Sequence, residues 1–291
     1  MTAPHDVNRL LVVGSGAMGS QIGMVAALAG IDTTIQDVSA EALERAEAQL
    51  RERIGSSVAK GRRTQEEAEA AFRRLSFSTD LEAAAADADY VIEAATERLD
   101  IKRQIFELLD AVTPAHAILA TNSSTLGSSS VADATDRPDR VCNLHFFNPA
   151  LVMRAVEIVR NPETSDKTIA TSVALAERLG KRPVLLNREI PGFVANRLMG
   201  AVRDEALRLY SDGIASVEDI DTAAKDALGY PMGPFELMDL VGLDVSYLIR
   251  QATYEQTGDP ADLPHPALVA LYEQGHYGRK TGKGWYEYAD Q

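Results

Sequence analysis

The stretch LLVVGSGAMG, residues 10–19, decides the fold of the first half of the chain. Four apolar residues are typical of a buried strand, and the glycines Gly14, Gly16 and Gly19 follow them directly. In such a unit the first glycine permits a tight turn, the second lets a pyrophosphate approach the backbone, and the third allows close helix–strand packing. We therefore predict a dinucleotide site, with phosphates bound where a helix begins at Ala17 and Met18.

An acidic residue stands where this kind of unit needs one. Asp37 follows an expected strand at residues 33–36 and lies 23 positions after Gly14. There a carboxylate can accept hydrogen bonds from the ribose hydroxyls and repel a 2′-phosphate, which favours NAD over NADP. A glycine pattern alone is weak, so a plain glycine-rich turn with a solvated Asp37 is the alternative.

Outward from this unit, short apolar runs alternate with helical patterns, which is typical of βαβ units and a parallel sheet. Further strands are expected at 90–93, 117–121, 141–145, 154–159 and 183–186, and helices at 17–29 and 101–112. Two more helices, at 40–60 and 65–74, are longer than an ordinary crossover. The predicted fold class is α/β, a Rossmann-like doubly wound sheet with a helical arm.

After Pro191 the pattern becomes helical throughout. Apolar residues at three- and four-residue spacing predict helices at 193–210, 217–228, 236–253 and 268–274. We expect an NAD-binding domain at residues 1–186 and an all-α domain for substrate and dimerisation at 187–291. Because a helical domain of about 100 residues is marginal alone, it is expected to pair with a second copy as a homodimer.

Composition excludes several classes of partner. The 291 residues carry 29 Lys and Arg against 43 Asp and Glu, a formal charge of −14, which disfavours nucleic acids and anionic membranes. The sequence contains no apolar run of the roughly 18–20 residues that span a bilayer, and residues 1–8 lack an export signal. A single cysteine, Cys142, favours a reducing cytoplasm, and without clustered Cys or His no metal site is expected.

Hydride exchange with NAD needs a group that handles the accompanying proton, and histidine is the usual one. His145 ends an expected strand, where doubly wound sheets place their active sites. Glu157 interrupts the apolar run AVEIV, and a buried carboxylate is costly unless it is paired. Pairing with Glu157 would orient the imidazole. Spacing equally allows Glu157 to point outward from an edge strand and His145 to be an ordinary core residue.

The run NLHFFNPALVMRAVEIV at residues 143–159, together with the glycine motif, resembles the L-3-hydroxyacyl-CoA dehydrogenase family. So do IPGFVANR at 190–197, GYPMGPFELMDLVG at 229–242 and YGRKTGKGWY at 277–286. The likeness covers nearly the whole chain, whose size is similar to that of the stand-alone short-chain members. It implies reversible, NAD-dependent oxidation of (S)-3-hydroxyacyl-CoA, 3-hydroxybutyryl-CoA in particular, to 3-oxoacyl-CoA.

The resemblance also implies residue roles. His145 is the expected catalytic base and Glu157 the carboxylate that orients it, while Ser124 contacts the substrate 3-oxygen and Asn196 helps to hold the reacting group. The remaining implied contacts are Glu97, Lys102, Asn148 and Lys280 for the cofactor and Lys60 for coenzyme A.

These residues also have ordinary structural alternatives. Ser124 could be a loop or helix-cap serine, and Asn196 a structural asparagine near a helix start. Glu97 and Lys102 could lie at a solvated helix start, and Lys60 on a solvated charged face. The sequence departs from the family at NSST, residues 122–125, and at Arg98, where Asn is common. Two rival functions remain open. One is an NAD-dependent dehydrogenase of a free hydroxy acid or sugar acid, and the other is a dinucleotide-binding protein without catalysis.

Overall fold

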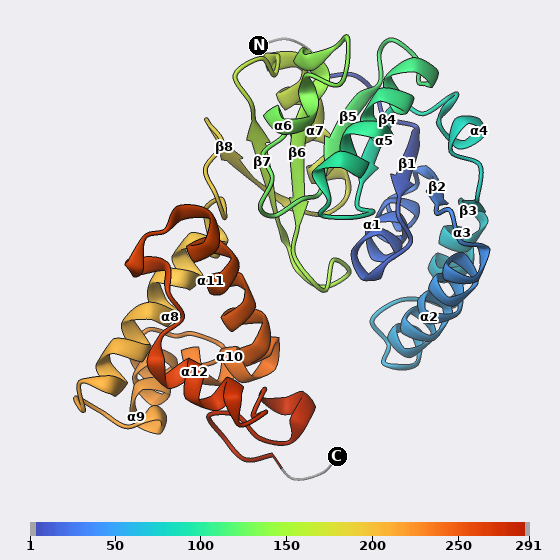
Figure 1. Ribbon diagram of the computed structural model, residues 1–291. Helices are drawn as coiled ribbons and strands as arrows, with labels where there is room; N and C mark the ends of the chain where they lie inside the picture. The colour runs from blue at the N-terminus through green and yellow to red at the C-terminus, as the bar shows by residue number, and fades with distance from the viewer. Residues whose placement is uncertain (1–3, 289–291) are drawn as a thin grey trace. The chain divides into compact units, whose positions relative to one another are not determined.

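The computed structural model describes residues 4–288 and divides into two units, Met1–Val194 and Ala195–Gln291. The first three residues of the polar N-terminal stretch therefore lie outside the described part. Figure 1 shows an open, twisted sheet in the first unit and helices in the second. The fold class predicted from the sequence, a Rossmann-like sheet followed by an all-helical region, is confirmed.

The sheet of the first unit has eight strands in the order β3-β2-β1-β4-β5-β6-β7-β8. The strands are β1 Arg9–Val13, β2 Asp32–Gln36, β3 Leu75–Ser78, β4 Tyr90–Glu93, β5 Ile118–Thr121, β6 Val141–Phe146, β7 Ala155–Arg160 and β8 Arg182–Leu186. All neighbours are parallel except β6 and β7, which are antiparallel. The chain builds outward from β1 and then returns to β4, so the β1–β4 border is the switch point where such folds bind ligands.

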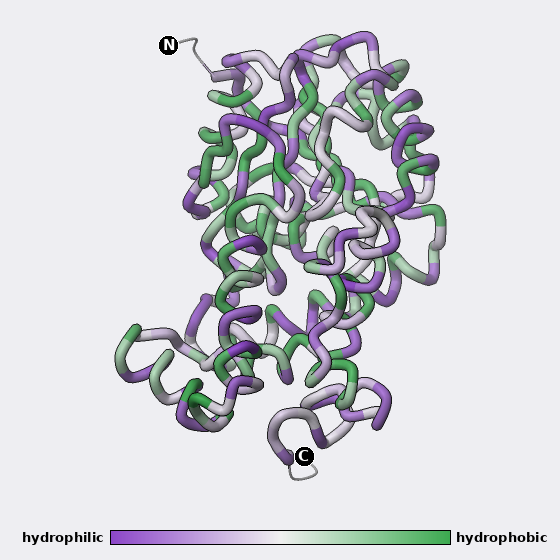
Figure 2. Tube along the Cα trace, turned by 60° about the vertical axis from the view of Figure 1, so that its left-hand side comes forward, coloured by the Kyte–Doolittle hydropathy of each residue, from purple (hydrophilic) through white to green (hydrophobic). Residues whose placement is uncertain are grey.

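Helices cover both faces of this sheet. They are α1 Ala17–Leu28, α2 Ala40–Ala59, α3 Gln65–Arg73, α4 Leu81–Ala85, α5 Leu99–Val112, α6 Ser129–Ala132 and α7 Asp166–Arg178. Alternate residues of β1 face opposite sides: Leu10 and Val12 pack with α1, α2, α3 and α7, whereas Leu11 and Val13 pack with α4, α5 and α6. In Figure 2 hydrophobic green segments run through the middle of this unit and hydrophilic purple ones along its outside.

The expected helical arm is present. Helices α2 and α3 contact each other and extend beyond the sheet beside β3 (Figure 1). Both begin at well-formed caps, because the Ser39 side chain accepts the Ala42 N–H, and Thr64 and Glu67 form a reciprocal capping box. Four elements were not predicted from the sequence: β3, α4, α6 and α7.

The second unit is helical, with α8 Ala195–Ser211, α9 Val217–Thr222, α10 Pro234–Val241, α11 Leu243–Thr257 and α12 Pro266–Glu273. The expectation of one continuous helix at 236–253 was wrong. Gly242 separates α10 from α11 at φ 106°, a conformation that strains any other residue, and a Cβ there would lie 2.7 Å from Oδ1 of Asp244.

Two buried carboxylates fasten the C-terminal segment to this helical unit. Asp221 accepts the Tyr286 hydroxyl, and Asp239 accepts the backbone N–H of Trp285 and the Tyr288 hydroxyl. Burial, and then the hydrogen bond to Asp239, raise the pKa of Tyr288 to about 12.

No helix within residues 4–288 is both long and apolar enough to cross a membrane.

The border between the units falls after Val194, eight residues later than the predicted end of the first domain at 186. Phe193 explains the difference, because it is buried against Val159 and Leu186 of the sheet. The segment between β8 and α8 therefore belongs to the first unit.

Candidate active site

In the glycine turn after β1, neighbouring backbone leaves no room for a side chain at Gly14 and Gly19, whereas the space beside Gly16 is open. Gly14 has φ 100° and donates its N–H to the Gln36 carbonyl at 2.7 Å. A Cβ on Gly14 would lie 2.6 Å from the Ala95 Cα, and one on Gly19 only 1.9 Å from the Gly14 oxygen. A Cβ on Gly16 would meet nothing within 4 Å. The backbone at the start of α1 is thus open to a pyrophosphate, and the turn fits NAD.

Asp37 lies beside this turn at the end of β2. Its Oδ2 accepts the Ser15 N–H at 2.8 Å and the Ser15 hydroxyl at 2.7 Å, and its Oδ1 accepts the Ser39 N–H at 3.1 Å. Partial burial raises the pKa of Asp37, but the hydrogen bonds from Ser15 and Ser39 outweigh it and hold the pKa below its usual value. Asp37 is therefore ionised, as an acceptor for ribose hydroxyls must be. The glycine motif does not indicate the two hydrogen bonds that Ser15 donates to Asp37.

His145 and Glu157 are direct cross-strand partners on β6 and β7. The imidazole Nδ1 lies 2.8 Å from Glu157 Oε2, and the two side chains are only 7% and 1% exposed. The other carboxylate oxygen accepts the Val194 N–H at 2.9 Å. Since β7 lies between β6 and β8, the alternative of an outward-pointing Glu157 on an edge strand is wrong.

Two aromatic rings enclose the imidazole. The ring centroids of Phe147 and Phe193 lie 4.6 Å and 5.6 Å from that of His145. With Nδ1–H donated to a carboxylate, the remaining nitrogen of the neutral ring, Nε2, keeps its lone pair for proton transfer.

The loop after β5 lies at the same, carboxyl edge of the sheet. Asn122 Oδ1 accepts the Phe146 N–H at 2.9 Å, which joins this loop to the strand that bears His145. Ser124 is half-buried in the loop, but its neighbour Ser123 is the serine that donates to Glu97, at 2.6 Å. The contacts of Asn122 and Ser123 were not predicted from the sequence.

Lys102 is buried rather than solvated. Its side chain is 1% exposed, and its ammonium donates to Glu93 Oε2 at 2.6 Å and to the Thr121 hydroxyl at 3.3 Å. The solvated alternative for Lys102 is therefore wrong, whereas Glu97 and Asn148 are both exposed. Glu93, which ends β4, did not figure among the predicted site residues.

The two remaining catalytic and cofactor candidates belong to the helical unit. Asn196 lies half-buried in the first turn of α8, and Lys280 donates to Asp244 at 2.7 Å. Contact of Asn196 or Lys280 with the cofactor bound to the first unit stays a prediction.

Both units of the chain match families of known proteins. Residues 9–190 match the family model for the 3-hydroxyacyl-CoA dehydrogenase NAD binding domain, and residues 192–288 match that for the 3-hydroxyacyl-CoA dehydrogenase C-terminal domain. The chain belongs to the 3-hydroxyacyl-CoA dehydrogenase family. It is accordingly an oxidoreductase that uses NAD.

Several relatives of the dehydrogenase match it over almost their full length. The probable 3-hydroxybutyryl-CoA dehydrogenase of Bacillus subtilis (strain 168) is 38% identical over 286 residues, covering 98% of this chain and 99% of the relative. The mitochondrial hydroxyacyl-coenzyme A dehydrogenase of Homo sapiens is 40% identical over 289 residues, covering 97% and 91%. The crystal structure of (S)-3-hydroxybutyryl-CoA dehydrogenase from Ralstonia eutropha superimposes with a TM-score of 0.89 at 34% identity, covering 98% and 100%.

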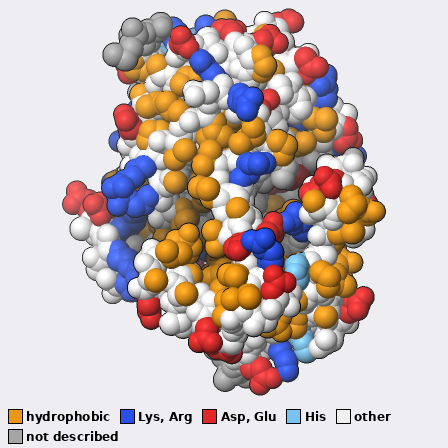
Figure 3. Space-filling view, turned by 90° about the vertical axis from the view of Figure 1, so that its left-hand side faces the viewer, with side chains coloured by type: hydrophobic (Ala, Val, Ile, Leu, Met, Phe, Trp, Pro, Cys, Tyr) orange, Lys and Arg blue, Asp and Glu red, His pale blue; other side chains and the backbone are white. Residues whose placement is uncertain are grey.

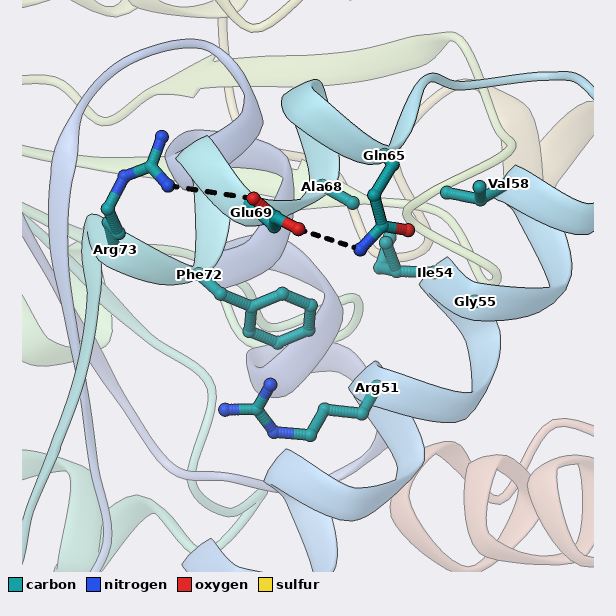
Figure 4. Close-up of a pocket in the computed structure, with 9 residues that line it drawn as sticks. All are labelled: Arg51, Ile54, Gly55, Val58, Gln65, Ala68, Glu69, Phe72 and Arg73. Atoms are coloured by element: carbon teal, nitrogen blue, oxygen red, sulfur yellow. Dashed lines mark hydrogen bonds and ion pairs between the residues drawn. The ribbon is translucent and has the colours of Figure 1, made fainter.

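The arm of the dehydrogenase has a hollow between its two helices (Figure 4), with a volume of about 460 Å³. Its lining comprises Arg51, Ile54, Gly55, Val58, Gln65, Ala68, Glu69, Phe72 and Arg73. The Arg51 guanidinium lies over the Phe72 ring, 4.5 Å from its centroid. Lys60 is not in this lining; it is exposed at the C-terminal end of α2.

Two glycines of the cofactor turn give a matched pair of variants, one expected to lose stability and the other to lose NADH affinity. Gly19→Ala is expected to lower the free energy of unfolding by about 1–3 kcal/mol, because its methyl group collides with the Gly14 backbone. Gly16→Ala is expected to change stability by less than about 1 kcal/mol but to weaken NADH binding about tenfold or more, because the methyl group occupies the pyrophosphate approach. Urea unfolding and NADH fluorescence titration measure the two effects. Unchanged NADH affinity in Gly16→Ala would contradict the assigned phosphate site.

Proposed function

We propose that this dehydrogenase catalyses reversible oxidation of short-chain (S)-3-hydroxyacyl-CoA, 3-hydroxybutyryl-CoA in particular, to 3-oxoacyl-CoA. The observation that carries the proposal is the buried His145–Glu157 pair at the carboxyl edge of an NAD-binding sheet. The names of the Bacillus subtilis and Ralstonia eutropha relatives support the short acyl chain.

The residues divide the work between binding and proton transfer. The turn from Gly14 to Gly19 and Asp37 hold the cofactor, with Glu97, Asn148 and Lys280 as further contacts. Bound NAD supplies the acceptor for the hydride that leaves C3 of the substrate. Nε2 of His145 takes the proton of the 3-hydroxyl group.

Glu157 keeps the His145 ring in one tautomer through Nδ1 and stabilises the imidazolium as it forms. The surrounding Phe147 and Phe193 rings restrict water around the base. Ser124 hydrogen-bonds the substrate 3-oxygen and Asn196 holds the reacting group. Lys60 binds a phosphate of coenzyme A at the end of the arm.

Steady-state reduction assays separate this function from its rivals. We expect NADH-dependent reduction of acetoacetyl-CoA and little reduction of free acetoacetate, with kcat/KM highest for the shortest acyl chains in a series of 3-oxoacyl-CoA substrates. Preferential reduction of the free acid would favour a hydroxy-acid dehydrogenase. NADH binding without turnover of any acyl-CoA would favour a non-catalytic protein.

Asp37 is expected to set the choice of dinucleotide. In Asp37→Ala the charged acceptor beside the turn is lost, and hydrogen bonds to a charged group are worth about 1.5–3 kcal/mol, or about 10–100-fold. We expect the KM for NADH to rise by this factor and the preference for NADH over NADPH to shrink. Asp32→Ala, at the other, exposed end of β2, is the control. Retained discrimination against NADPH in Asp37→Ala would contradict the role.

We also propose a homodimer formed through the helical unit. Its exposed apolar side chains include Leu198, Met199, Leu240, Val241, Leu248 and Ile249. Figure 3 shows hydrophobic side chains interspersed with charged ones on the surface. Three of these side chains, Leu198, Met199 and Val241, line one hollow of the helical unit, and a contiguous apolar surface of this kind is typical of an interface. Sedimentation is expected to give twice the 31.4 kDa chain mass, and Leu248→Asp the chain mass itself. A monomeric wild type would contradict the proposal.

The single cysteine supports placing the dehydrogenase in a reducing compartment, the cytoplasm. Cys142 is buried on β6, and burial raises the pKa of its thiol, so it is an unreactive core residue rather than half of a disulfide.

A further inference from the structure

Two histidines and one aspartate meet at the edge of the sheet opposite the active site. His5 precedes β1, Asp89 precedes β4 and His116 precedes β5, and these three strands are parallel neighbours. Their side chains therefore gather at the amino-terminal edge, whereas His145 lies near the carboxyl end of β6, which is parallel to β5. The cluster is separate from the catalytic residues.

The ligand atoms have the spacing of a metal site. Asp89 Oδ1 lies 2.9 Å from Nε2 of His116 and 3.9 Å from Nε2 of His5, and all three lie within 4.8 Å of one another. In tetrahedral zinc sites, bonds of about 2.0–2.2 Å place neighbouring ligand atoms about 3.4 Å apart. The two observed distances lie on either side of that value, so small side-chain adjustments are enough to admit an ion.

Local contacts orient both kinds of ligand. Asp89 Oδ2 accepts the N–H groups of Asn8 and Arg9 at 2.8 Å and 2.9 Å, which leaves Oδ1 turned toward the imidazoles. The backbone N–H of His5 donates to the Thr171 hydroxyl at 3.0 Å, which fixes the start of this segment. Carboxylates that ligate metal ions are usually oriented by hydrogen bonds of this kind to their other oxygen.

The cluster also has an unused polar atom. Within residues 4–288, His5 Nε2 is buried and has no hydrogen-bond partner, although it faces Asp89. A buried nitrogen without a partner costs free energy, and a cation between the three side chains would supply the missing bond.

We propose that His5, Asp89 and His116 form a binding site for a divalent cation of the zinc class, with water completing its coordination. Imidazole nitrogen and carboxylate oxygen are ligands that suit zinc, cobalt and nickel better than magnesium. The ion would tie the segment before β1 to the segments that precede β4 and β5. Its role is structural, because the catalytic pair lies at the other edge of the sheet. The sequence does not indicate this site, because its three ligands are far apart along the chain, at positions 5, 89 and 116.

The test is calorimetric titration of chelator-treated, untagged protein with zinc chloride. The wild type is expected to bind one equivalent at this site, and His5→Ala and His116→Ala each to bind it at least about tenfold more weakly. His276→Ala removes an imidazole from the helical unit and is the matched control, expected to bind zinc as the wild type does. Affinity for NADH, measured for each variant, verifies that the fold is intact.

Thermal unfolding gives an independent reading. Zinc at about 100 times its Kd is expected to raise the Tm of the wild type by about 5 °C and that of His116→Ala by much less. Dehydrogenase activity without zinc is expected to be unaffected, so this result is separate from the test of the proposed function. The absence of zinc binding, even at millimolar concentration, would overturn the proposal. So would equal stoichiometry and affinity in all four proteins.

Discussion

His145→Gln is expected to lower kcat by about 10²–10⁴-fold, the usual contribution of a positioned acid–base group. Glutamine keeps a hydrogen-bonding side chain of similar reach, but it cannot accept a proton from the 3-hydroxyl group at neutral pH. The pair with Glu157 shows that the ring is held in one orientation before substrate arrives, so the loss falls on proton transfer. Steady-state kinetics with acetoacetyl-CoA and NADH measure it.

Binding of the dinucleotide is expected to survive this change. The glycine turn follows β1 and Asp37 follows β2, so neither lies on the strand that bears His145. NADH affinity is expected to stay within about twofold of wild type, which gives a loss in kcat without a loss in cofactor binding. His116→Gln, at the opposite edge of the sheet, is the control and is expected to retain full kcat. A His145→Gln enzyme with near-wild-type turnover would remove His145 from the role of base.

The sequence predicts well those features that depend on local spacing. Residues 10–19 define a strand, turn and helix because Gly14 takes a positive φ in the turn and Gly19 packs directly against the Gly14 backbone, both within this stretch. The Leu10–Val13 strand faces both layers of helices, which its unbroken apolar run already indicates.

The His145–Glu157 contact depends on information that spacing lacks. It requires β7 to run antiparallel to β6, with a register that sets these two residues opposite each other. The intervening residues carry no two-residue hairpin signal that would fix the register. For this reason the sequence left the pairing open, and the structure decides it.

Two further features differ in how far the sequence indicates them. Glu93 ends the apolar run YVIE and, like Glu157, is a carboxylate whose burial requires a partner, so the sequence does indicate it. By contrast, nothing local to His5 or His116 indicates that both face Asp89.

Lys102→Met is expected to destabilise the protein by about 3–5 kcal/mol, because it leaves the Glu93 carboxylate buried without its counter-ion. The Thr121 hydroxyl and the Ala95 N–H still donate to Glu93, at 2.8 Å and 2.9 Å, but neither neutralises its charge. Urea unfolding measures the loss. The double variant Glu93→Gln, Lys102→Met removes both charges and is expected to recover most of the stability.

The same variants decide whether Lys102 also contacts the cofactor, as the family resemblance implies. A side chain that is 1% exposed offers almost no surface to a dinucleotide. We therefore expect NADH affinity to stay within about threefold of wild type in both variants, measured at a temperature where each is folded. A loss of tenfold or more in the single and the double variant alike would instead place the ammonium at the cofactor, since restoring the stability would not restore the binding.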